Sequence, residues 1–479
     1  MIDKKMITRK TAIGITLIVL IGLTSWGLAG ALEEQSYINQ GKAEYNRGNY
    51  DAAIYLFNKA IDLNPDYEYL YNDRGMCYMA LGELDTAISE FSKAIELKSD
   101  CVEAYYNRGL AHFKQGGWGN EGPFDLAIAD YGKVTELKPD YADAYYNRGL
   151  AYNQLYHYAS KPFSAEINET YHKAIADFDK VLELDPTYVL AYAGKGNAYY
   201  RNGEFDNATA EFDNALDSWA LILEQSDGKG LAGVYASRAR NYKEMLEINK
   251  SISDYEQAIA LDPKLMIALS HQASNYDMIG EYEEAIETYD AELDILENDP
   301  DYKDYEWGYY TYKGRGACCY ELGRYDEAIV DFQTLIDDYE SHYEPLAYRY
   351  LGMIYTEKGD EDKAKENYDK AVGLYSGQIE STPDSYGLYN DRGLCYLGLG
   401  EYDSAISDFE KVIELEPNYV DPHSGENLYI EAYKNLGIAY SASGDKDKAK
   451  EALEEGLKLA NEQGLKETAT EIENLLGDL

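Results

Sequence analysis

The eight residues AYYNRGLA occupy positions 104–111 and recur without change at positions 144–151. Each copy contains a glycine, Gly109 in the first and Gly149 in the second. Gly41 and Gly75 precede Gly109 at intervals of 34 residues, and each of these three glycines is followed by another glycine seven residues later. Self-similarity at a fixed period of a few tens of residues is the signature of a repeat array. The sequence therefore predicts a series of similar units rather than one compact core.

Extending this register along the chain gives eleven reference positions, and a small residue stands at every one. They are Gly41, Gly75, Gly109, Gly149, Gly196, Ala239, Ala273, Gly316, Gly352, Gly393 and Gly437. Tyrosine stands four residues before the reference position in ten of the eleven units, with Leu269 as the exception. Further along each unit, an alanine such as Ala87 is followed four residues later by an aromatic residue such as Phe91. Residues four apart share one face of a helix, so each unit is expected to contain two helices with a common buried face.

The period of 34 residues, the small reference residue and the alanine–aromatic pair resemble the tetratricopeptide repeat family. The resemblance covers residues 36–462, about eleven repeats, and implies an all-α fold, a right-handed α-solenoid (superhelix) of helix–turn–helix units. In six repeats, additional residues are expected to form loops. These loops would lie between the two helices in repeats three and four, and after the second helix in repeats five, seven, nine and ten. Residues 463–479 are amphipathic and predict a C-terminal capping helix over the last repeat.

The N-terminal residues differ in character from the repeats. Basic residues at positions 4, 5, 9 and 10 precede the uncharged stretch 11–32. About 20 such residues suffice to cross a bilayer as a helix, so residues 1–35 are expected to be a signal-anchor. The small residues at 29–31 leave a cleaved signal peptide as the alternative. In both cases the remainder is expected to be extracytoplasmic, either anchored by residues 11–32 or secreted, because positive flanking charge stays on the cytoplasmic side.

The chain is strongly acidic, with 88 Asp and Glu against 43 Lys and Arg and a net charge of −45. This balance argues against nucleic-acid binding, which needs a basic surface. It is compatible with solubility at high salt, with basic partners or with cations. The five cysteines show no metal-ligand spacing, and Cys77, Cys318 and Cys395 all stand two residues after a reference position. They are therefore expected to pack as small apolar residues.

Arg108 and Arg148, in the middle of the repeated octapeptide, belong to a set of charged residues that vary together. Seven repeats carry a basic residue directly before the reference position, and the same seven carry an acidic residue directly before the second-helix aromatic. The pairs are Arg74 and Glu90, Arg108 and Asp130, Arg148 and Asp177, Lys195 and Glu211, Arg238 and Asp254, Arg315 and Asp331, and Arg392 and Asp408. The other four repeats lack both charges. Positions that vary together usually touch, so we expect a structural ion pair that joins the two helices within each of these repeats.

No nucleotide-binding, metalloprotease or serine-hydrolase motif occurs in the chain. The sequence thus predicts no enzyme, no cofactor and no metal site. The family resemblance implies a protein-interaction scaffold that binds a partner peptide or helix in a concave groove lined by the first helices. The positions that would face this groove include Asn72, Tyr106, Tyr146, Asn197, Tyr200, Arg240, Lys313 and Arg349. The alternative is a structural or adhesive surface protein whose acidic exterior binds divalent cations. The N-terminal segment alone is expected to contact the membrane. The oligomeric state is left open.

Overall fold

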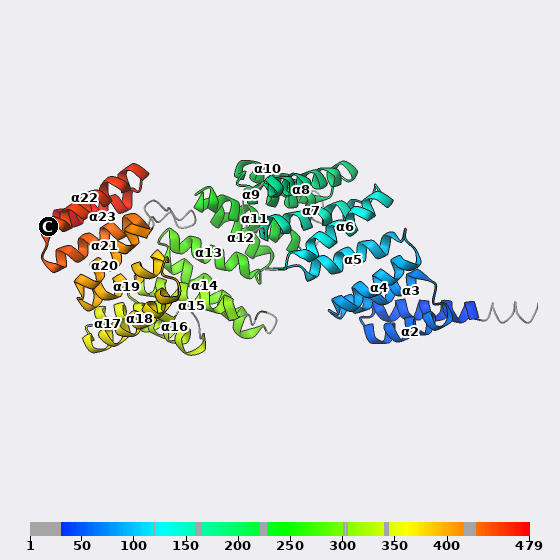
Figure 1. Cartoon of the computed structure of the whole chain (residues 1–479), viewed down its shortest axis with the longest axis horizontal. Coiled ribbons are helices and arrows are strands. Elements are labelled where there is room, and N and C mark those ends of the chain that lie inside the picture. Colours follow the sequence, from blue (N-terminus) through cyan, green and yellow to red (C-terminus); the bar gives the residue numbers. More distant parts are fainter. Residues whose placement is uncertain are drawn as a thin grey trace, which may run out of the picture. The chain divides into compact units, whose positions relative to one another are not determined.

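The computed structural model describes residues 30–117, 120–158, 165–220, 228–299, 302, 305–339, 344–415 and 428–479. These residues form α-helices joined by short turns, with one isolated bridge between Gly117 and Asn120 and no strand among them. The chain divides into two compact units, unit 1 up to Ile222 and unit 2 from Leu223 to Leu479. Figure 1 shows both units as helices packed in successive hairpins.

Unit 1 begins with a helix over residues 30–46 and continues through α10. Its helices are α2 (Tyr50–Leu63), α3 (Glu68–Ala80), α4 (Leu84–Leu97), α5 (Val102–Gln115), α6 (Gly122–Leu137), α7 (Ala142–Tyr158), α8 (Ala165–Leu184), α9 (Val189–Arg201) and α10 (Phe205–Ala220). Each helix packs on the next one in the chain. Pro65, Pro139 and Pro186 follow the ends of α2, α6 and α8, because proline has no N–H with which to continue a helix.

Unit 2 has the same plan and ends with a single helix. Its members are α11 (Lys229–Glu244), α12 (Ile248–Leu261), α13 (Met266–Met278), α14 (Tyr282–Asn298), α15 (Tyr305–Glu321), α16 (Tyr325–Asp338), α17 (Glu344–Glu357), α18 (Glu361–Ser381), α19 (Tyr386–Leu399), α20 (Tyr402–Leu415), α21 (Leu428–Ser443), α22 (Lys446–Gln463) and α23 (Lys466–Gly477). Odd-numbered helices from α11 to α21 are the first helices of their repeats. Helix α23 packs on α22.

The helix pairs coincide with the eleven units read from the sequence, with differences at the insertions and at the start. Extra residues in repeat nine lengthen α18 to 21 residues instead of forming a loop. The extra residues of repeat four partly extend α7 and α8. In repeat three, Gly116, Gly117, Asn120 and Glu121 lie between α5 and α6, as expected. The first helix already includes residues 30–35, so the expected boundary at residue 35 falls inside a helix.

The two helices of a repeat approach each other most closely where the second-helix aromatic ring meets the reference glycine. A methyl group added to Gly75 would lie 2.7 Å from the Phe91 ring, and one added to Gly393 would lie 2.7 Å from the Phe409 ring. Phe91 and Phe409 are fully buried, as are the alanines four residues before them, Ala87 and Ala405. The small reference residue is therefore required by the ring that covers its α-carbon.

The cysteines lie in this packed interior. All five are free thiols and buried, and Cys77, Cys318 and Cys395 are 0% exposed. Burial raises the pKa of the Cys77 and Cys395 thiols to about 12, so both are protonated at neutral pH. Their place in the structure is that of the alanines at the same register position, such as Ala111.

The predicted hydrophobic helix at residues 11–32 lies, apart from its last three residues, outside the described part of the chain. Within the described ranges, no helix is both long enough and apolar enough to span a bilayer.

Candidate partner-binding groove

The predicted groove residues of unit 1 bond to neighbouring repeats. Asn72 is only 4% exposed and accepts a hydrogen bond from the Nδ2 of Asn107, at 2.9 Å. Tyr106 accepts one from the Nδ2 of Asn147 at 3.0 Å, and its ring stacks on Tyr141. Asn72 therefore offers almost no surface to a partner, and the ladder of polar contacts serves to join one first helix to the next.

The remaining predicted residues of unit 1 are also engaged within the unit. The ring of Tyr146 packs between Phe178 and Tyr188, with centroids 6.0 and 5.1 Å away. Asn197 donates a hydrogen bond to its own helix, at the carbonyl of Ala193. Tyr200 contacts Phe205. All of these side chains are half-buried, so they contribute to the fold as well as to the inner face of the unit.

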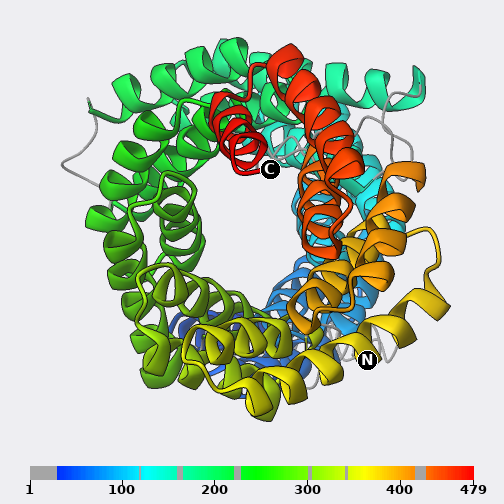
Figure 2. The same ribbon diagram turned by 90° about the vertical axis from the view of Figure 1, so that its left-hand side faces the viewer.

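In unit 2, by contrast, the first helices and α23 surround a large open groove. The groove has a volume of about 1340 Å³ and is lined by residues of α13, α14, α15, α17, α19, α21 and α23. Figure 2 shows the helices of this unit, coloured green to red, following a curve with α23 on its inner side. The volume exceeds the 300–1,000 Å³ typical of small-molecule pockets. Its size and openness suit a polypeptide segment better than a metabolite.

The three predicted groove residues of unit 2 differ in their relation to this groove. Arg349 lines it, together with Asn390 and Lys434 from the same register position of the next two repeats. Lys313, one repeat earlier, is half-buried and is not among the residues that line the groove, and burial lowers its pKa. Arg240 borders a separate cavity of about 100 Å³ beside His271 and Tyr255. Sequence reasoning thus located one of the three in the main groove.

The groove carries charges of both signs. Lys434 contacts Glu431 and Glu471, with Nζ–O distances of 2.7 and 2.9 Å. Arg349 lies 3.8 Å from Asp391, and its guanidinium covers the ring of Tyr350. Among the described residues, no group of three or more His, Cys, Asp or Glu side chains is arranged to hold a metal ion. The polar character of the lining favours recognition of a charged partner.

The seven predicted ion pairs are all brought together, each between the two helices of one repeat. Six arginines face their carboxylate through Nε and Nη2; for Arg148 these atoms lie 2.8 and 2.7 Å from the Asp177 oxygens. Lys195 contacts Glu211 at 2.9 Å. The other five are Arg74 with Glu90, Arg108 with Asp130, Arg238 with Asp254, Arg315 with Asp331, and Arg392 with Asp408. The arginines are 17–24% exposed, and each covers the ring of the tyrosine three residues before it, such as Tyr145 beside Arg148.

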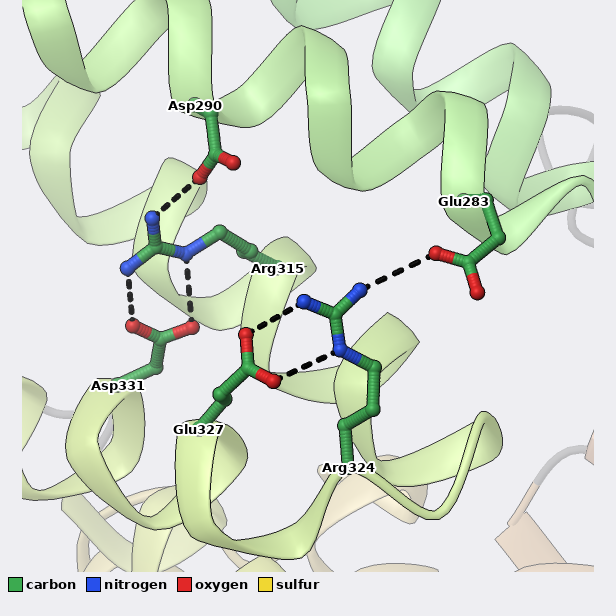
Figure 3. Close-up of polar contacts among 6 residues, drawn as sticks. All are labelled: Glu283, Asp290, Arg315, Arg324, Glu327 and Asp331. Carbon is green, nitrogen blue, oxygen red and sulfur yellow. Dashed lines mark hydrogen bonds and ion pairs between the residues drawn. The ribbon is translucent and has the colours of Figure 1, made fainter.

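The basic side chain also reaches the preceding repeat, a contact that the sequence analysis missed. Arg315 bonds Asp331 of its own repeat and, through Nη1, Asp290 on α14 (Figure 3). Lys195 lies 2.8 Å from Asp179 on α8. Hydroxyl or amide groups take this place elsewhere: Asn58 for Arg74, Ser92 for Arg108, Thr135 for Arg148 and Ser376 for Arg392. Asn58, Ser92, Asp179 and Asp290 stand directly after the second-helix aromatic, but Thr135 and Ser376 do not, and a polar residue also follows the aromatic in repeats whose neighbour lacks the arginine. No single register position therefore identified this contact.

Burial and attraction oppose each other within these pairs. Burial raises the pKa of Asp177, and the Arg148 guanidinium only partly offsets this change. For Arg148, burial disfavours the charge, but the hydrogen bonds and charge of Asp177 outweigh it and raise the pKa. The net stabilisation by such a pair is therefore small, whereas removal of one partner leaves a buried charge alone.

Glu292 on α14 has a buried carboxyl group that the sequence analysis did not single out. It stands three residues after the aromatic Tyr289, where the other repeats have an apolar residue or glycine. The side chain is 0% exposed. Burial raises its pKa to about 8, and the nearby Thr311 hydroxyl offsets only part of that shift. The register position itself was the signal that could have identified it.

Models of known protein families match segments in both units. Profiles described as TPR repeat match residues 41–80, 75–116, 121–155 and 169–217. Profiles described as tetratricopeptide repeat match residues 232–265, 351–377 and 384–462. Together these matches include more than half of the chain.

Individual relatives are distant. The chain is 23% identical over 246 residues to the Hsp70-Hsp90 organizing protein of Triticum aestivum, covering 45% of this chain and 41% of that protein. It is 28% identical over 173 residues to the BBSome complex member BBS4 of Bos taurus, covering 36% of this chain and 30% of that protein. The chain therefore spans about two fifths or less of the length of these curated relatives.

Two solved structures are similar over larger parts of the chain. A tetratricopeptide repeat protein from Parabacteroides merdae is 19% identical with a TM-score of 0.45, over 58% of this chain and 99% of that one. Yeast Tom70 is 17% identical with a TM-score of 0.40, over 92% of this chain and 95% of that one.

The Arg148–Asp177 pair can be tested by a double-mutant cycle. Arg148→Ala is expected to lower the free energy of unfolding by roughly 3–5 kcal/mol, because it leaves the Asp177 carboxylate buried and alone. Arg148→Ala combined with Asp177→Ala should recover part of that loss. Urea denaturation followed by circular dichroism measures all four proteins. Strictly additive losses would refute the pairing.

Glu292→Gln tests the buried carboxyl through its pH dependence. The folded pKa, about 8, lies above the ordinary value of 4.5, so the folded state retains a proton that the unfolded chain releases. The stability contributed by this group is therefore complete below pH 4.5 and declines as pH rises through 8. The glutamine variant should match the wild type near pH 5 and exceed it by roughly 2–4 kcal/mol near pH 9. Thermal unfolding at both pH values, with the exposed Glu287→Gln as control, measures this; a gain independent of pH would contradict the assignment.

Proposed function

The chain belongs to the tetratricopeptide repeat family, and on that premise we propose that it is a non-enzymatic scaffold that binds a segment of another protein in the groove of unit 2. The observation that carries the proposal is the groove itself, with its volume of about 1340 Å³ and its lining drawn from six helices of the array and α23. An extended peptide or a helix crossing several repeats would contact a side chain from each of them. Relatives whose names describe organizing or complex-forming proteins support the same function.

Part of the proposed function is a location outside the cytoplasm, with the array tethered to a membrane by residues 11–32. The support is the sequence alone: 22 uncharged residues preceded by four basic ones. A tether would hold the groove near other membrane or surface proteins and so raise their effective concentration.

Site-specific photo-crosslinking tests the groove. Benzoylphenylalanine in place of Met278, which is 37% exposed and lines the groove, should form crosslinks to a partner in native extracts. Benzoylphenylalanine in place of Val330, which is 60% exposed on α16, is the matched control and should form no crosslinks to the partner. Equal capture from both positions, or capture from Val330 alone, would contradict groove binding.

Fractionation tests the tether. The full chain is expected to stay in the membrane pellet after carbonate extraction, because an apolar helix holds it in the bilayer. Deletion of residues 11–32 should move it to the soluble fraction, and protease added outside spheroplasts should degrade the full-length protein. Recovery of the full chain in the soluble fraction would contradict the tether.

A further inference from the structure

The lining of the unit 2 groove contains more acidic than basic side chains. Five carboxylates and three cations border it. Glu431 and Glu471 share Lys434, and Asp391 faces Arg349. The third cation, Lys466, is exposed at the start of α23.

Two of the carboxylates, Asp277 and Glu321, therefore remain. Neither takes part in an ion pair among the described residues. Within the described ranges, the carboxylate of Asp277 accepts a hydrogen bond only from the thiol of Cys318, at 3.6 Å, while the charges of Lys243 and Lys313 act on it from beyond contact distance. These two side chains are the carboxylates of the groove lining that have no ion-pair partner in direct contact among the described residues.

Asp277 and Glu321 lie close enough to influence each other and two tyrosines. Burial raises the pKa of Glu321, and the charge of Asp277 adds to the shift. Burial and the charges of both carboxylates raise the pKa of Tyr282 and Tyr350, which line the same groove. The Tyr350 ring is held in place by stacking on Phe332, with centroids 4.6 Å apart. Carboxylates beside aromatic rings form a favourable site for an ammonium or guanidinium group.

Asn390 is an independent sign of a missing polar ligand. It is 9% exposed and lines the groove, yet its Oδ1 has no hydrogen-bond partner. A buried amide without partners costs free energy until something bonds to it. An amide side chain offers one acceptor and two donors, which matches the main chain of an extended peptide. A peptide main chain could therefore donate an N–H to this Oδ1 and accept from the amide nitrogen.

We propose that the unit 2 groove binds a basic segment of a partner protein, with a lysine or arginine side chain between Asp277 and Glu321 near Tyr282, and peptide main chain on Asn390. This inference rests on the proposed function and specifies the chemistry of the partner. The net charge of −45 would attract such a segment over long range. A neutral segment filling the same groove would desolvate Asp277 and Glu321 without compensation.

The test uses three fluorescein-labelled peptides that share one Gly-Ser background and carry arginine, glutamine or glutamate at the same positions. Fluorescence anisotropy with the full chain should show the arginine peptide binding at least about tenfold more tightly than the glutamine peptide, which corresponds to about 1.4 kcal/mol. The affinity should fall as salt is added. The glutamate peptide should not bind.

Because an acidic chain attracts any basic peptide weakly, the decisive comparison is among variants. Asp277→Asn and Glu321→Gln should each weaken binding of the arginine peptide about five- to tenfold, and together they should abolish the preference over glutamine. Glu287→Gln removes the same charge from an exposed position on α14 and should leave the affinity unchanged. Unchanged circular dichroism and melting of the two groove variants would show that they fold.

The alternative outcomes separate this inference from the proposed function. Preference for the glutamate peptide, or equal loss in the Glu287 control and the groove variants, would overturn the basic-segment inference and leave groove binding intact. If none of the three peptides binds while a partner still crosslinks at position 278, the basic-segment inference is overturned and groove binding stands. If benzoylphenylalanine at position 278 captures no partner in native extracts, the result counts against the proposed function itself.

Discussion

The contact between an aromatic ring and the α-carbon of a glycine sets the distance between the two helices of a repeat. Where Phe91 covers Gly75, there is no room for a methyl group between them. The ring, the alanine one turn before it and the glycine thus form a closed apolar contact in eight of the eleven hairpins. Every other feature of the repeat, including the position of the arginine next to the glycine, depends on this close approach.

The arginine beside the glycine converts the hairpin contact into a link between repeats. Its Nε and Nη2 bond the carboxylate of the second helix, while Nη1 reaches the second helix of the preceding repeat, as Arg315 does between Asp331 and Asp290. The planar guanidinium can serve three acceptors at once because its donors point in fixed directions. Lys195, a point charge, serves two. Since each repeat contacts only its neighbours, such links carry the cooperativity of the array.

The inner faces of the two units use the same register positions for different purposes. In unit 1, Asn72, Tyr106 and Tyr146 bond or stack with neighbouring repeats and are largely satisfied there. In unit 2, Arg349 and Asn390 border an open groove, and the amide of Asn390 has no partner. Unsatisfied polar groups are unusual in a folded chain, and Asn390 combines one with a place on the lining of an open groove, which makes unit 2 the place to seek a ligand.

The sequence by itself determined the repeat, its period, the helix pairs and the partners of seven basic residues, because each of these leaves a mark at a fixed register position. It could not rank the eight groove candidates, since a first helix presents Asn72 and Asn390 at the same position in both units. Only the tertiary structure decided that Asn72 is bonded to Asn107 while Asn390 faces an open space. It also revealed an acceptor in the preceding repeat for five of the six arginines, and two groove carboxylates, Asp277 and Glu321, without a direct ion pair. Those features depend on which side chains of different repeats come into contact. Packing between helices, rather than spacing along the chain, sets the distances between these side chains.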